Sequence, residues 1–173
     1  MKVLVAIEGS EFSRAAVEKS CKMFDESENT EIRIISVVEP AFVAAAPYAL
    51  STGNLFEADD GAATKAAQRI VAHAEAEVEA RFPDLAIGLT TKVVKGAPDE
   101  AIIKEAREWR ADLIVMGSHG YGGWRRAVLG SVSDSVMRQA PCSVLVVRPS
   151  EKPSGSYTFR GQAAETETRG GSE

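Results

Sequence analysis

The chain alternates short, almost continuously apolar runs with segments of helical periodicity, and this alternation constrains its fold more than any other feature. Five apolar runs and four helical segments follow one another strictly along the sequence. Runs without a period of two are typical of strands covered on both faces, as in a parallel sheet. We therefore expect an α/β fold, a single doubly wound, Rossmann-like domain in which a five-stranded parallel sheet carries four helices.

The bounds of the expected elements follow from the same patterns. Strands are predicted over residues 2–7, 32–38, 85–95, 112–116 and 142–147. Helices are predicted to begin near Ser10, Gly61, Pro98 and Ser131, with acids in the first turn of the third. The stripes predicted to face the sheet from the first three helices are Val17, Cys21 and Phe24, then Ala66, Ile70, Ala74, Val78 and Phe82, then Ile102, Ala106 and Trp109.

Two segments lack such patterns. Residues 39–60 contain two prolines and three consecutive alanines without a sustained period, which indicates a long connection of the kind that often carries function. Residues 150–173 are rich in Pro, Gly, Ser, Thr and Glu, so we expect a domain over 1–149 and a disordered tail over 150–173. An alternative is that Tyr157 and Phe159 make part of the tail a docking peptide.

Composition excludes several classes of protein. The net charge is -5, and no stretch gathers Lys or Arg, which argues against a nucleic-acid or anionic-membrane surface. We find neither a signal-peptide layout nor an apolar run of the roughly 20 residues that a membrane helix needs, so we expect a cytoplasmic protein. Cys21 and Cys142 lie far apart and are expected to be buried thiols, and His73 is expected to be solvated.

A glycine-rich segment from Gly117 to Ser131 links the fourth strand to the last helix. In a doubly wound fold, ligands bind beyond the carboxyl ends of the strands, where such a connection lies. Glycines let backbone N–H groups approach an anion, and the start of a helix favours phosphate. The segment therefore predicts a phosphate-binding loop. Ser131 is interpreted as a helix cap, as a phosphate donor, or as both.

Other chemistries that use similar loops are disfavoured. The segment has no Gly-Lys-Ser or Gly-Lys-Thr, and no Gly-x-Gly-x-x-Gly follows the first strand, so the P-loop and dinucleotide classes do not fit. Ser118 lies next to His119 without a Gly-x-Ser-x-Gly elbow, and adjacent residues rarely face each other, so a serine hydrolase is disfavoured. No magnesium-binding carboxylate stands beside a lysine in the usual layouts, so we expect slow hydrolysis of a bound phosphate compound or self-phosphorylation at most.

The residues resemble the universal stress protein family, in its ATP-binding branch. The resemblance rests on the opening from Val3 to Ser10, the stretch from Ala111 to Gly120, and the ending from Gly130 to Ser133 followed by residues 142–147. Gly117, Gly120 and Gly130-Ser131 fit the family's Gly-x2-Gly-x9-Gly-Ser/Thr motif at full spacing. The resemblance implies the strand order 3-2-1-4-5, and ATP with or without magnesium, or cyclic AMP, in one cleft.

Carried over position by position, the resemblance also implies the site residues. The base and ribose side would be contacted by Ala6, Ile7, Glu8, Val37 and Met116. The turn would be lined by Gly117, Ser118, His119, Gly120 and Gly122, and the phosphates would be held by Gly130, Ser131 and Val132. The chain departs from the family pattern at Glu8, where Asp is common, and at Ala6, where one branch has Pro.

The resemblance further implies a homodimer, formed through the last strand at Val144–Val147, that acts with a protein partner in the stress response. Three hypotheses stay open at this point. The first is an ATP-binding regulatory dimer, and the second is a nucleotide-independent interaction module of the same fold. The third is a weak ATPase or self-phosphorylating protein modified at Ser131 or Ser133.

Overall fold

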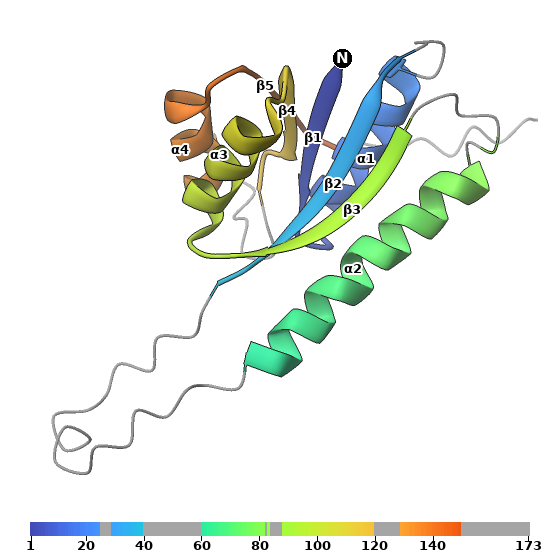
Figure 1. Ribbon diagram of the computed structural model, residues 1–173, viewed down its shortest axis with the longest axis horizontal. Coiled ribbons are helices and arrows are strands. Elements are labelled where there is room, and N and C mark those ends of the chain that lie inside the picture. Colours follow the sequence, from blue (N-terminus) through green and yellow to red (C-terminus); the bar gives the residue numbers. More distant parts are fainter. Residues whose placement is uncertain (25–28, 40–59, 82, 84–87, 120–128, 150–173) are drawn as a thin grey trace, which may run out of the picture.

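The computed structural model describes residues 1–24, 29–39, 60–81, 83, 88–119 and 129–149 (Figure 1). In this part of the chain strands and helices alternate strictly, and their bounds are β1 (Lys2–Ile7), α1 (Glu11–Phe24), β2 (Glu31–Val38), α2 (Asp60–Arg81), β3 (Gly88–Lys95), α3 (Pro98–Trp109), β4 (Leu113–Gly117), α4 (Ser131–Gln139) and β5 (Ser143–Val147). All pairings are parallel, in the order β3-β2-β1-β4-β5. The predicted fold class is confirmed, together with the strand order that the resemblance implied.

The helices form two layers, one on each face of the sheet (Figure 1). On one face, α1 and α2 pack against alternate residues of the central strands, such as Val3, Val5 and Ile7 of β1. On the other, α3 and α4 pack against Leu4 and Ala6. Because both faces are covered, β1, β2 and β4 are almost entirely buried, which is why their sequences read as continuous apolar runs.

The buried stripe of α2 differs from the predicted one. Ala66 is exposed, and Ala67 and Val71 are buried in addition to Ala74 and Val78. Four residues turn an α-helix by about 40° more than one full turn, so residues at a constant spacing of four drift steadily around the helix. Residues at alternating spacings of four and three stay on one face. Phe82, at the end of the predicted stripe, lies outside the described residues.

Burial elsewhere follows the predictions with two exceptions. Val17, Cys21, Ile102 and Ala106 are buried as expected, while the side chain of Phe24 lies outside the described part. Trp109 is only half-buried. Two cations lie over its ring, the guanidinium of Arg33 at 4.3 Å from the ring centre and Lys2 Nζ at 5.4 Å.

The second exception is Cys142, which is half-buried rather than buried. Burial, together with the nearby carboxylate of Asp112, raises the pKa of its thiol. His73 is exposed, as predicted, and its Nδ1 lies 3.8 Å from Glu77 of the same helix.

The sheet reverses its winding direction between β1 and β4. The connection after β1 leads to β2 on one side, and β4 and β5 lie on the other side, so β1 and β4 are neighbours with Ala6 opposite Met116. The carboxyl ends of these two strands therefore lie side by side. Ligands of doubly wound folds bind outside such a switch point.

Candidate functional site

The apolar residues of the predicted site divide between the two faces of the sheet. Ala6 and Met116 are buried partners on the face covered by α3 and α4, and half-buried Val37 packs on the same face. The side chain of Ile7 packs in the opposite layer, against α1 and α2. A ligand on the α3/α4 side could therefore contact Ala6, Val37 and Met116 by their side chains, but Ile7 only by its backbone.

Glu8 lies directly after β1, half-buried at the carboxyl edge of the sheet. Ser10 Oγ donates a hydrogen bond to Glu8 Oε1. Burial raises the pKa of the Glu8 carboxyl, and the bond from Ser10 and backbone hydrogen bonds oppose that rise only in part. The edge thus carries a desolvated carboxylate, an acceptor for hydroxyl or amine donors.

Gly117, the first glycine of the motif, has a structural reason to be glycine. A Cβ placed on it would lie 2.8 Å from Phe12 Cβ and 3.0 Å from the Phe12 carbonyl carbon. The missing side chain therefore allows the first turn of α1 to pack on the end of β4. Phe12 was not singled out by the sequence, although an aromatic residue in the first turn after a Gly-Ser helix start is a signal for such packing.

The next two residues face each other, contrary to the expectation for adjacent positions. Ser118 Oγ lies 3.1 Å from His119 Nδ1, and the imidazole ring in turn lies 5.4 Å from the ring of Phe12, tilted by 51°. Ser118 is completely buried. Because a nucleophile must reach its substrate, burial now disfavours a serine hydrolase, whereas adjacency on its own does not.

The start of α4 corrects the interpretation of Ser131 as a helix cap. The N-cap is Gly130, with φ -74° and ψ 155°, and no side chain caps the helix in the part of the chain that the structure describes. Ser131 is the first helical residue and is exposed. The N–H groups of the first turn are therefore not satisfied by a cap, and their positive dipole end is the kind of site that binds phosphate.

Main-chain and hydroxyl contacts hold this helix start against the end of β4. Gly130 N donates to the Ser118 carbonyl oxygen at 2.8 Å, and Ser133 Oγ lies 3.2 Å from the same oxygen and 2.9 Å from the Gly130 carbonyl. A Cβ on Gly130 would lie 3.2 Å from the Ser118 oxygen, which is tighter than an ordinary contact, so a side chain here would need the Ser118 carbonyl to shift. Ser133 is buried, which leaves Ser131 as the accessible one of the two serines considered as phosphate acceptors.

Part of the predicted site cannot be placed. Gly120 and Gly122 lie outside the described residues, as do the tail and its docking-peptide alternative. The described part brings together Ala6, Glu8, Met116, Gly117, Ser118, His119, Gly130, Ser131 and Val132 through the paired ends of β1 and β4 and the Gly130–Ser118 bond. It adds Ser10, Phe12 and Ser133, which the sequence analysis did not assign to the site.

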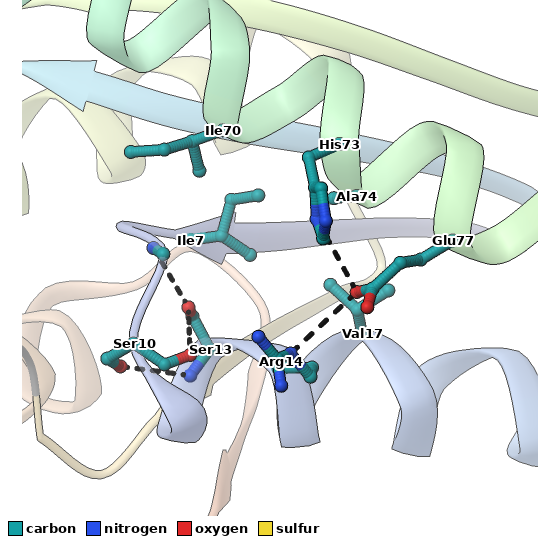
Figure 2. A pocket seen from close by; sticks show the side chains of 10 residues that line it. Ile7, Ser10, Ser13, Arg14, Val17, Ile70, His73, Ala74 and Glu77 are labelled. Atoms are coloured by element: carbon teal, nitrogen blue, oxygen red, sulfur yellow. Dashed lines mark hydrogen bonds and ion pairs between the residues drawn. The ribbon is translucent and has the colours of Figure 1, made fainter.

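A small cavity lies on the other side of β1, between α1 and α2 (Figure 2). Its volume is about 50 Å³, and Ile7, Ser13 and Val17 are among its lining residues. At its rim, Glu77 lies 3.8 Å from both Arg14 and His73. The charges of Glu77 and Arg14 balance one another, and the volume is below that of a nucleoside, so the cavity is not the nucleotide site.

Within the described residues, no group of three or more His, Cys, Asp or Glu side chains is placed to hold a metal ion. None of the helices described there has the length and hydrophobicity of a membrane span.

Similarity to known proteins agrees with this architecture. A putative universal stress protein of Staphylococcus aureus (strain USA300), SAUSA300_1656, is 44% identical over 80 residues, which are 46% of each chain. The match therefore spans about half the length of this relative. The structure of hypothetical protein MJ0577 is 25% identical with a TM-score of 0.67, covering 87% of this chain and 96% of that one.

A universal stress protein solved in complex with cAMP is 26% identical, with a TM-score of 0.61, and the match covers 86% of this chain and 97% of that one. The model of the universal stress protein family matches residues 1–148. That range contains every described strand and helix, and it includes both ends of the glycine-rich segment. The chain belongs to the universal stress protein family.

Proposed function

We propose that the chain binds an adenine nucleotide at the carboxyl edge of β1 and β4. The observation that carries this proposal is the start of α4, which no side chain caps within the described residues and which the Gly130–Ser118 bond holds at the end of β4. An uncapped helix start with glycine beside it favours phosphate, and a switch point is where this fold class binds ligands.

The neighbouring residues suit the rest of a nucleotide. Apolar Ala6, Val37 and Met116 would contact the base, Glu8 would accept a hydrogen bond from the nucleoside, and the backbone of Ser131 and Val132 would hold phosphate oxygens. The family member solved with cAMP supports an adenine ligand. We propose ATP as the ligand, with or without magnesium, and cAMP as the alternative.

Thermal unfolding with and without nucleotide tests this proposal. ATP, ADP, cAMP and GTP are added to the wild-type chain, each with and without magnesium. A ligand at about 100 times its Kd stabilises the folded state by about 2.7 kcal/mol, which raises Tm by roughly 5–10 °C for a domain of this size. We expect this shift with adenine nucleotides.

Two glycine variants make the test specific to the site. In Gly130→Ala the new Cβ presses on the Ser118 oxygen beside the helix start, so the nucleotide-induced shift should shrink. In Gly88→Ala the Cβ meets only the Glu31 side chain at an ordinary 3.6 Å, so the shift should be retained. No shift with any nucleotide, in wild-type protein shown to carry none, would favour the nucleotide-independent interaction module.

We further propose that the chain acts as a regulatory dimer in the stress response, in the cytoplasm, where its two thiols, which form no disulfide, stay reduced. The last strand supports the dimer, since β5 pairs only with β4 among the described strands and its apolar residues Val144–Val147 are half-exposed. An open apolar edge favours pairing with another strand. Light scattering at micromolar concentration checks this, and a monomeric mass would reject it.

A further inference from the structure

The hydroxyl of Ser10 holds the carboxylate of Glu8 at the end of β1. Glu8 follows β1 at the carboxyl edge, and its side chain turns back so that Oε1 accepts a hydrogen bond from Ser10 Oγ. A free glutamate side chain samples several rotamers, and fixing it on binding costs conformational entropy. In this chain that order is already present without a ligand.

The helix start does not depend on the proton that Ser10 donates. A serine hydroxyl has one proton to donate, which goes to Glu8, and its lone pairs accept the bond from Ser13 N at 3.3 Å. Ser13 makes its own connections, because its Oγ accepts from Gly9 N at 3.1 Å and donates to the Ser10 carbonyl at 3.0 Å (Figure 2). The first turn of α1 is thus tied by two serines, of which only Ser10 contacts Glu8.

The position of this pair relates it to the nucleotide site. The strand ends that flank the site are joined at Ala6 and Met116, and Glu8 lies two residues beyond Ala6 on the same edge. A carboxylate has about four acceptor positions, and the Ser10 hydroxyl together with the backbone N–H groups of Glu8 and Ser10 occupies up to three of them. The carboxylate that Ser10 holds can therefore still accept a hydrogen bond from a hydroxyl of a bound nucleoside.

We propose that Ser10 is a positioning residue of the nucleotide site, whose hydroxyl holds Glu8 so that its carboxylate accepts a hydrogen bond from a ribose hydroxyl. This inference rests on the proposed nucleotide binding. Without the Ser10 hydroxyl, Glu8 must be ordered when the ligand binds, and immobilising one such side chain weakens affinity by about two- to tenfold.

Calorimetric titration of the full chain with ATP and with 2′,3′-dideoxy-ATP tests the inference. Ser10→Ala should weaken ATP binding by about two- to tenfold and leave binding of the dideoxy compound unchanged. Ser10→Thr, which keeps a hydroxyl, should restore ATP affinity. Ser13→Ala is the matched control, since it removes a serine from the same turn without touching Glu8, and it should keep wild-type affinity.

A mutant cycle separates positioning from a general effect on folding. In a Glu8→Ala background, Ser10→Ala should cause no further loss of ATP affinity, because the residue through which it acts is gone. An equal loss in both backgrounds, an equal loss for both nucleotides, or an equal loss in Ser13→Ala would overturn the role of Ser10 while leaving nucleotide binding intact. A wild-type chain that binds no adenine nucleotide would overturn the proposed function as well.

Discussion

Replacing Glu105 with glutamine tests whether a buried charge cluster supports the α3 side of the fold. Glu105 is 4% exposed, and its two oxygens accept hydrogen bonds from Arg33 Nη1 of β2 at 2.8 Å and Lys92 Nζ of β3 at 2.6 Å. The variant Glu105→Gln keeps the shape of the side chain but removes its charge. It leaves the half-buried guanidinium of Arg33 without a counter-ion in this cluster.

The size of the loss follows from how exposed each partner is. The bond from Arg33, whose side chain is 24% exposed, is worth about 1.5–3 kcal/mol as a hydrogen bond to a charged group. Lys92 is 47% exposed, and solvent screening reduces its contribution to about 0–1 kcal/mol. Because the glutamine retains one acceptor, we expect the free energy of unfolding at pH 7 to fall by about 2 kcal/mol, or Tm by about 4–8 °C.

The loss should depend on pH in a defined direction. Burial alone would raise the pKa of Glu105, but the hydrogen bonds and charges of Lys92 and Arg33 together lower it. A lowered pKa in the folded state means that the stabilisation is present above the unfolded pKa near 4.5 and is lost as the pH falls through the folded value. Wild type and variant should therefore converge in stability below pH 4.5.

Urea unfolding at pH 7 and at several pH values down to 3 measures this difference. Glu108→Gln serves as the control, because Glu108 is exposed on the same helix and its pair with Lys104 spans 3.9 Å, so it should change stability by less than about 0.5 kcal/mol. The reasoning is refuted if Glu105→Gln is as stable as the control at pH 7, or if its deficit stays constant down to pH 3.

Three further substitutions follow from the packing. Gly117→Ala should lower the free energy of unfolding by about 1–3 kcal/mol in urea, since its Cβ meets Phe12 at 2.8 Å; wild-type stability would contradict this. Val136→Ala should lower the free energy of unfolding by about 2 kcal/mol in the same assay, because this side chain of α4 is completely buried. A loss below about 0.5 kcal/mol would contradict this and would mean that the neighbouring residues collapse into the space left by the side chain. Ser135→Ala removes the hydroxyl that donates to Asp99 at 2.6 Å and lowers its pKa, so NMR titration should show that pKa rising; an unchanged value would refute the contact.

The architecture could be predicted because strands that are buried on both faces have largely apolar sequences. The run from Ile32 to Val38 is apolar except at Arg33 and Ser36, and most residues of the strand found there are buried. Strand order came instead from the resemblance, since a pattern of apolar residues does not say which strands are neighbours. The stripe of α2 was shifted by one residue at Ala66, because a constant spacing of four drifts off the face that the helix buries.

The site was less accessible to sequence reasoning, for geometric reasons. Gly117 was interpreted as part of a phosphate loop, but its missing side chain is explained by the approach of Phe12, which is far away in sequence. Ser131 matched a capping pattern, but the helix begins one residue earlier than that pattern assumes, with Gly130 as the cap. The packing at Gly117 and the start of α4 are both set by tertiary contacts, which a local motif does not encode.

The bond from Gly130 to Ser118 has a consequence for how family members diverge. It joins the two ends of the glycine-rich segment by main-chain atoms at 2.8 Å. Because main-chain groups are the same for every residue type, the residues between these ends can be exchanged, and their number changed at small entropic cost, without moving α4 or β4. The sequence of this segment can thus diverge among family members while the scaffold that presents it stays constant.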